Sequence, residues 1–195
     1  MKILGINGLG VVPSACLLIE GKLVAFAEEE RFTRLKGSFG SMPSGATKFC
    51  LDFSGLKLED IDYIAFGWDA KLYRYYMPLF VIGKYLTRSP KSQRSSNIFK
   101  VAEELIKYQP ANVVRLLTEM FRTVGVKGRM PAVQFIPHHL AHAASAFYTS
   151  GFEKAHILVI DGSGENRCTS VLKGDGTKLT TIKSYSIPDS LGWFY

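Results

Sequence analysis

The histidines of this chain are gathered in one short stretch. All four, His138, His139, His142 and His156, lie within 19 residues, and the other 176 residues contain none. The alanine-rich run over residues 138–148 predicts a helix, on which His138 and His142 lie one turn apart on the same face. That spacing lets two imidazoles bind one metal ion.

A carboxylate is placed to complete such a site. Asp161 ends the apolar strand predicted over residues 157–160. Two histidines and one carboxylate with open positions suit Fe(II), and also Mn or Zn. His139 faces away from the pair and is a candidate for an outer contact to the metal ligands or to substrate. In the alternative interpretation one histidine caps or packs the helix start and the others lie in solvent.

Two glycine-rich segments resemble each other and form an internal repeat. Residues 3–10 (ILGINGLG) match residues 157–164 (ILVIDGSG), and a predicted hairpin follows each copy. Chance is the alternative, because strand-glycine-strand patterns are common. Two such lobes are typical of the actin, sugar-kinase and Hsp70 superfamily, in which facing glycine turns hold nucleotide phosphates with backbone N–H groups. The residues that we expect to contact a nucleotide in this way are Gly8, Gly10, Gly162, Ser163 and Gly164.

The order of the predicted elements defines the fold class. Up to residue 150 we expect three strands (3–6, 15–19 and 23–27), a helix (43–53), a strand (61–66), a helical region (72–86 and 98–124, interrupted near Pro90 and Pro110), a strand (132–136) and the histidine-bearing helix. This α/β layout predicts a ribonuclease-H-like lobe with a mixed sheet over residues 1–150, with a basic helical insert at about 71–130. Residues 151–195 are expected to begin a second, similar lobe that is truncated at Tyr195, and we expect the natural chain to continue.

Composition and charge narrow the partners. No apolar run approaches the ~20 residues needed to cross a bilayer, and three scattered cysteines fit a reducing, cytoplasmic location. The net charge is +7, and residues 84–129, with ten basic and three acidic side chains, carry all of that excess. An anionic partner is one interpretation; solvated helix faces are the one we favour, since no nucleic-acid motif accompanies the charge. We therefore expect neither a membrane nor a nucleic acid as partner.

Several of these motifs together resemble the O-carbamoyltransferases of the nodulation and antibiotic-tailoring type. The resemblance extends over almost the whole chain in matching order, and the charged run at 28–36 and the histidine block are its specific parts. The resembling segments are residues 15–21, 28–36 (EEERFTRLK), 138–148 (HHLAHAASAFY), 161–165 (DGSGE) and 190–195 (SLGWFY).

The resemblance implies an activity and a site. Family members use ATP and carbamoyl phosphate to make carbamoyl-adenylate in a C-terminal domain, and the N-terminal domain transfers the carbamoyl group to a hydroxyl of a small molecule. It implies iron on His138, His142 and Asp161, and a contact of Lys36 with substrate or adenylate. We therefore expect the full-length protein to be an enzyme whose partners are a small-molecule acceptor and the C-terminal part of its own chain, and the 195-residue chain alone to be inactive.

One departure from the family pattern leaves alternatives open. The family has His-Asp in the first glycine turn, where this chain has Val11 and Val12. A histidine there would serve as general base for the acceptor hydroxyl, and His139 is a candidate to replace it. The alternatives are a non-catalytic nucleotide- or metabolite-binding relative, or a protein similar to the tRNA threonylcarbamoyl transferases.

Overall fold

The computed structural model describes residues 1–69, 71, 106–186 and 190–192. Its contacts divide the chain into two units: Met1–Gly67 with Ile106–Phe135, and Trp68–Leu105 with Ile136–Tyr195. Among the described residues, no helix is long and apolar enough to cross a membrane.

The first unit contains a five-stranded mixed sheet in the order β3-β2-β1-β4-β5. The antiparallel pairs β1–β2 and β2–β3 form the predicted meander, β4 pairs in parallel with β1, and β5 pairs in parallel with β4. The strands are β1 (Lys2–Asn7), β2 (Ser14–Ile19), β3 (Lys22–Glu28), β4 (Tyr63–Phe66) and β5 (Ala132–Phe135). This order is the ribonuclease-H-like layout that the sequence predicted, so the α/β fold class is confirmed.

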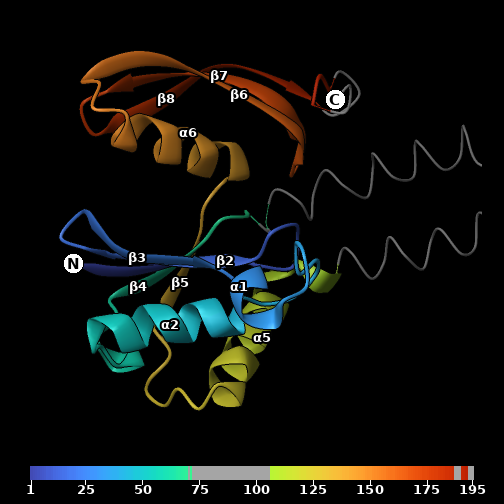
Figure 1. Cartoon of the computed structure of the whole chain (residues 1–195). Coiled ribbons are helices and arrows are strands. Elements are labelled where there is room, and N and C mark those ends of the chain that lie inside the picture. Colours follow the sequence, from blue (N-terminus) through green and yellow to red (C-terminus); the bar gives the residue numbers. More distant parts are fainter. Residues whose placement is uncertain (70, 72–105, 187–189, 193–195) are drawn as a thin grey trace, which may run out of the picture. The chain divides into compact units, whose positions relative to one another are not determined.

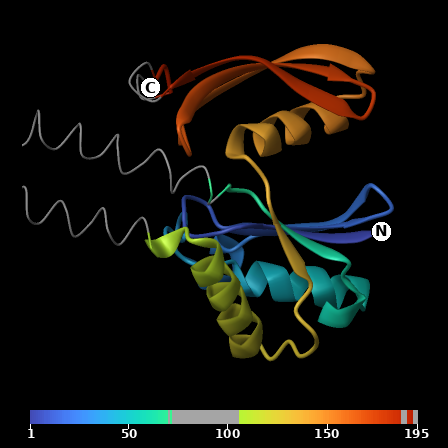
Figure 2. The same ribbon diagram turned by 180° about the vertical axis from the view of Figure 1, so that it is seen from behind.

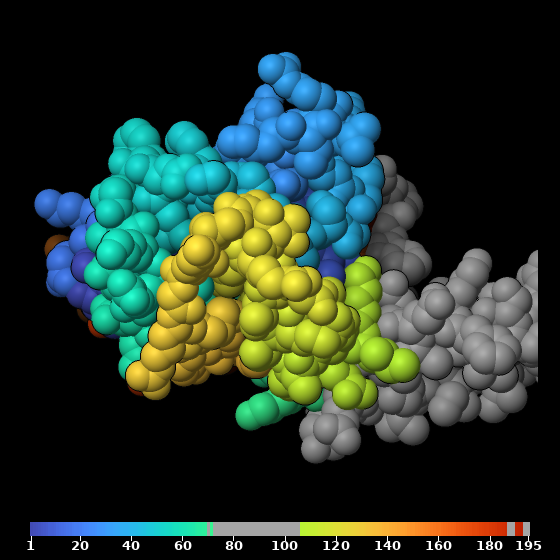
Figure 3. Space-filling model, turned by 90° about the horizontal axis from the view of Figure 1, so that it is seen from below, coloured from blue at the N-terminus to red at the C-terminus, as the bar shows by residue number. Residues whose placement is uncertain are grey.

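Helices cover one face of this sheet. They are α1 (Glu30–Thr33), α2 (Ser44–Ser54), the 3-10 turn η1 (Leu58–Asp60) and α5 (Pro110–Thr123). Alternate residues of β1, Leu4 and Ile6, are buried under the helices, where Cys50 of α2 and Leu117 of α5 are fully buried. α2 and α5 lie on the same side of the sheet in Figures 1 and 2, and Figure 3 shows them from that side. The side chains on one face of the strand, which recur every second residue, and those on one face of each helix, which recur about every 3.6 residues, therefore pack into one core.

The second unit is a three-stranded antiparallel sheet with one helix on it. The strands β6 (Lys154–Gly164), β7 (Arg167–Asp175) and β8 (Lys178–Ser186) are in sequential order, and the helix is α6 (His138–Thr149). α6 runs along one face of the sheet (Figure 1). Its side chains Ala143 and Phe147 are buried against Ile157, Val159 and Leu172.

The structure differs from the sequence-based expectations in three places. The charged run at 28–36 contains the short helix α1, which its pattern did not indicate. β6 continues through Gly164, so residues 161–164 are an irregular strand end rather than a glycine turn, and the turn itself is at Glu165 and Asn166. α6 groups with the second sheet, so the contact boundary falls after Phe135 and not at residue 150.

Part of the predicted basic insert lies outside the described residues. The helix expected at 72–86, the polar loop at 87–97 and the start of the helix expected at 98–124 belong there. In the remainder of that last helix, residues 106–107 are helical and the backbone then breaks at Tyr108 and Gln109. α5 begins after this break at Pro110, as the fixed φ of proline at a first helical position favours.

The first glycine turn contains a strained residue. Val12 has a φ of 48°, a left-handed conformation that is unfavourable for a β-branched side chain. The Asn7 side-chain amide donates hydrogen bonds to the carbonyls of Val11 and Val12, at 3.2 and 3.0 Å, and these bonds hold the turn.

We expect Val12→Asn to stabilise the protein by about 1 kcal/mol, because asparagine adopts the left-handed conformation at less cost than valine. Urea unfolding measures the change. Val11→Asn is the matched control, since Val11 is exposed and its φ is not positive. An equal response of the two variants would contradict the assignment of strain to Val12.

Candidate metal centre

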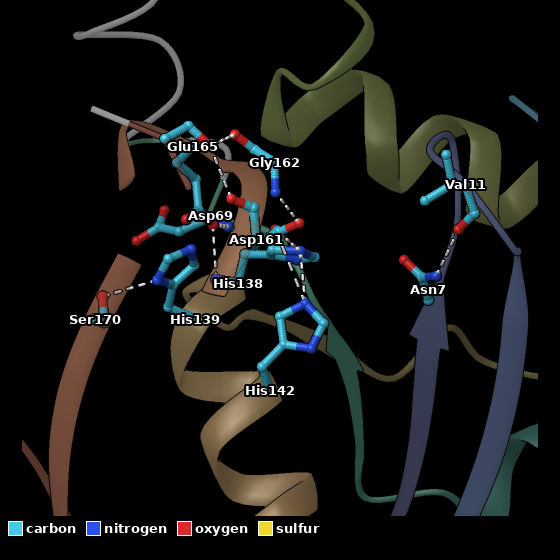
Figure 4. A network of polar contacts seen from close by, with 11 residues as sticks. Asn7, Val11, Asp69, His138, His139, His142, Asp161, Gly162, Glu165 and Ser170 are labelled. Atoms are coloured by element: carbon cyan, nitrogen blue, oxygen red, sulfur yellow. Dashed lines mark hydrogen bonds and ion pairs between the residues drawn. The ribbon is translucent and has the colours of Figure 1, made fainter. Parts of the chain in front are cut away.

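Two elements of the second unit supply the predicted metal ligands. His138 is the first residue of α6 and His142 follows one turn later, so both imidazoles project from the same face of the helix. Asp161 lies near the end of β6, and its side chain points to the two imidazoles in Figure 4. The structure therefore brings together the three residues that the sequence nominated, all within the second unit.

The distances fit a divalent metal ion. His138 Nε2 lies 3.0 Å from His142 Nε2 and 3.1 Å from Asp161 Oδ2, and His142 Nε2 lies 4.0 Å from the same oxygen. Donor atoms bound to one ion at about 2.1 Å cannot be more than ~4.2 Å apart. All three separations satisfy that limit, and His142 is half exposed, so positions on the ion would be open to a further ligand.

The surroundings favour the protonation states that metal binding needs. A hydrogen bond from His138 holds the pKa of Asp161 below its usual value, and burial is the smaller, opposing effect. Partial burial lowers the pKa of His142 and the neighbouring His138 lowers it further, against the smaller, opposing effect of the Asp161 carboxylate. Because metal ligation requires an ionised carboxylate and neutral imidazoles, both shifts favour the binding forms near neutral pH.

His139 has surroundings different from those of its neighbours. Its ring is 2% exposed, and Nδ1 lies 2.7 Å from the hydroxyl oxygen of Ser170, a fully buried residue of β7. In Figure 4 it points toward β7 while His138 and His142 turn toward Asp161. Its role as general base stays a prediction, and the geometry favours packing and orientation of α6.

Glu165 is a residue of the site that sequence reasoning did not single out. It follows the end of β6, is 2% exposed, and one carboxylate oxygen, Oε1, accepts hydrogen bonds from the backbone N–H groups of His138 and Asp69. Burial raises the pKa of Glu165, and the two backbone hydrogen bonds oppose that rise. The only signal in the sequence was its place in the DGSGE segment, which says nothing of a partner 27 residues away.

The glycines of the second segment have packing roles in the structure. A β-carbon at Gly164 would lie 2.7 Å from the His138 ring and 2.8 Å from the His139 ring, so glycine lets both imidazoles approach the strand. The N–H of Gly162 donates to Asp161 Oδ1 at 2.6 Å. The predicted contacts of Gly162, Ser163 and Gly164 with a nucleotide stay predictions.

The other predicted site residues belong to the first unit. Gly8 packs against Met42 and Pro43, and the carbonyl of Gly10 accepts a hydrogen bond from the Gly40 N–H. Lys36 lines a hollow of about 360 Å³ together with Glu30, Arg31 and Arg34. This cluster carries three positive charges and one negative charge, which suits an anion, and its role stays a prediction.

Comparison with known proteins identifies the family. The family described as Carbamoyltransferase N-terminus matches residues 2–195. The chain therefore belongs to this family, as its motifs indicated.

Two curated relatives extend well beyond the matched region. The uncharacterized protein sll1178 of Synechocystis sp. is 34% identical over 99% of this chain and 30% of its own length. The nodulation protein NolNO of Sinorhizobium fredii is 34% identical over 93% of this chain and 24% of its own length. The chain thus spans less than a third of each of these relatives.

Solved structures give weaker likenesses. YeaZ from Pseudomonas aeruginosa aligns with a TM-score of 0.46 and 14% identity over 96% of this chain and 68% of that protein. A Ppx/GppA family member from Aquifex aeolicus aligns with a TM-score of 0.34 and 15% identity, covering 96% of this chain and 51% of that protein. We draw no conclusion about function from either.

The buried His139 should make stability depend on pH. Burial lowers its pKa to about 4, against the opposing effect of the Asp161 carboxylate, whereas an unfolded histidine titrates near ~6.5. Between these values the unfolded chain binds more protons than the folded one, so the free energy of unfolding falls as the pH is lowered through this window. Urea unfolding at several pH values, with chelator present, should show a steeper fall for the wild type than for His139→Gln. Parallel curves would show that His139 is not the group responsible.

Proposed function

We propose that this chain is the N-terminal part of an ATP-dependent O-carbamoyltransferase that transfers a carbamoyl group from carbamoyl-adenylate to a hydroxyl of a small molecule. Family membership supports a carbamoyltransferase. The observation that supports a metal-dependent site is the close grouping of His138, His142 and Asp161. The proposal includes a cytoplasmic location, which the three free cysteines support.

The residues of the second unit have separable tasks in this proposal. His138, His142 and Asp161 hold the metal ion, which when bound neutralises negative charge that develops on the acyl oxygen or on the leaving phosphate. The Trp68 ring lies 4.9 Å from the His138 ring and limits its rotation on one side. His139, through Ser170, fixes the helix face that presents the ligands. The metal that we propose is Fe(II) or a similar divalent ion.

A non-catalytic relative that binds a nucleotide or metabolite is the second candidate. Val11 and Val12 stand where the family resemblance implies His-Asp, and valine cannot take a proton from an acceptor hydroxyl. His139, the candidate replacement, is buried and hydrogen-bonded to Ser170, and this counts against its reaching the hydroxyl of an acceptor substrate. These two observations favour a binding role without transfer.

The metal ligands are tested first on the chain itself. We expect Asp161→Ala to weaken binding of Zn²⁺ or Co²⁺ by at least about 100-fold, because loss of a ligand costs more than the 10–100-fold typical of an outer-shell partner. Isothermal titration calorimetry and metal analysis after dialysis measure this. Asp175→Ala is the matched control, since Asp175 forms exposed ion pairs with Lys154 and Lys173 and should leave the affinity unchanged. Unaltered binding by Asp161→Ala would remove Asp161 from the site.

Activity is tested on the full-length protein. With ATP, isotopically labelled carbamoyl phosphate and a pool of hydroxylated small molecules, the wild type should place label on an acceptor, and Asp161→Ala should reduce the rate by at least about 100-fold. Adenylate formation without transfer to any acceptor would favour the non-catalytic candidate instead.

A further inference from the structure

The buried carboxylate of Glu165 joins the two elements that carry the metal ligands. Its Oε1 accepts the backbone N–H of His138 at 2.9 Å and that of Asp69 at 2.7 Å. Glu165 itself follows β6 by one residue, four residues after Asp161. The segment 161–165 therefore supplies the ligand Asp161 at its start, and Glu165 at its end binds the backbone of the ligand His138 (Figure 4).

The start of α6 has a specific need for such an acceptor. The first N–H groups of a helix have no partner within it, and a side chain at the N-cap usually accepts one of them. The N-cap here is Pro137, and no side-chain capping bond is formed from it. A carboxylate is also favoured near a helix start because the helix dipole is positive there. Glu165 meets this need from another element.

In the first unit, a buried glutamate likewise binds the start of a helix, and that helix carries no proposed metal ligand. α2 also has a proline, Pro43, at its N-cap and no side-chain cap. The buried carboxylate of Glu29 accepts the N–H groups of Gly45 at 3.1 Å and Ala46 at 2.9 Å. Glu29 is therefore a natural control for what a buried capping glutamate contributes to folding alone.

Burial of an ionised carboxylate costs free energy, and two kinds of interaction can offset that cost at Glu165. Two N–H donors and the helix start offset part of the cost of removing the charge from water. A cation held by His138, the residue whose N–H it binds, would attract the same carboxylate. The close packing of Gly164 against the His138 ring leaves that ring little freedom to adjust if the helix start shifts.

We infer that Glu165 is a positioning residue for the metal centre: its carboxylate fixes the start of α6 so that His138 meets His142 and Asp161 at ligand distance. This inference rests on the proposed metal site and deepens it. Glu165 is not one of the metal ligands. It affects metal binding through its hydrogen bond to the His138 backbone and through the negative charge of its carboxylate. The removal of an outer contact of this kind typically weakens metal binding 10–100-fold.

The test compares four variants of the full chain: Glu165→Ala, Glu165→Gln, Glu29→Ala and Glu29→Gln. Glutamine keeps an acceptor oxygen without the charge, and alanine removes both. Affinity for Zn²⁺ and Co²⁺ is measured by calorimetry, melting temperature by circular dichroism, and exchange of the amides at 138–141 by mass spectrometry without metal. We expect metal affinity to fall about 10-fold in Glu165→Gln and about 100-fold in Glu165→Ala. The Glu29 variants should lower the melting temperature comparably and leave the affinity within about twofold.

The outcomes separate the inference from the proposed function. Wild-type affinity in the Glu165 variants, or equal weakening by the Glu29 variants, overturns the positioning role. If the wild type binds no metal, the proposed metal site fails, and amide exchange decides the inference. Faster exchange at 138–141 in Glu165→Ala but not in Glu29→Ala then supports a role in fixing His138, and unchanged exchange overturns it.

Discussion

The close packing of α6 on β6 and β7 is the contact on which the candidate metal centre depends. Two ligands come from the helix and one from the strand, so they meet only if the helix lies at the right depth on the sheet. Ala143 and Phe147 set that depth against Ile157, Val159 and Leu172. Gly164 and Gly174 allow it, because a β-carbon at either position would collide with a ring from the helix, of His138 and His139 or of Phe147. The glycines of the strands thus lie under the rings of the helix, and the larger strand side chains pack beside them in one close-packed layer.

The sequence predicted those parts of the molecule that depend on local patterns. Short apolar runs, together with a glycine turn between β2 and β3 and an alternating pattern in β4, located the five strands of the first sheet. The spacing of His138 and His142 placed both on one helix face, and the position of Asp161 after an apolar run placed it near the strand end. The family resemblance rested on motifs that these elements carry. These predictions succeeded because each depends on residues close together in the sequence.

The parts that the sequence could not supply depend on contacts between distant segments. Glu29 and Glu165 each bind the start of a helix whose N-cap is a proline. In the sequence, nothing distinguishes these two glutamates from other charged residues. Helical spacing turns His139 away from His138 and His142, but it does not reveal that the residue is buried with Ser170 as its partner. The glycines at 162–164 predict a turn, and the backbone there is instead an irregular strand end beside the helix. Tertiary packing overrode a local preference in that case.

The distance between Asp161 and Glu165 along the chain has an evolutionary consequence. One residue faces the histidine pair and the other binds the start of the same helix, and the irregular end of β6 runs between them. An insertion or deletion of a single residue between them would shift one partner relative to the other by about 3.3 Å, the rise of one extended residue. The length of this segment should therefore stay constant, and Gly164 within it should stay glycine, whereas the surface loops of the same unit can vary in both length and sequence.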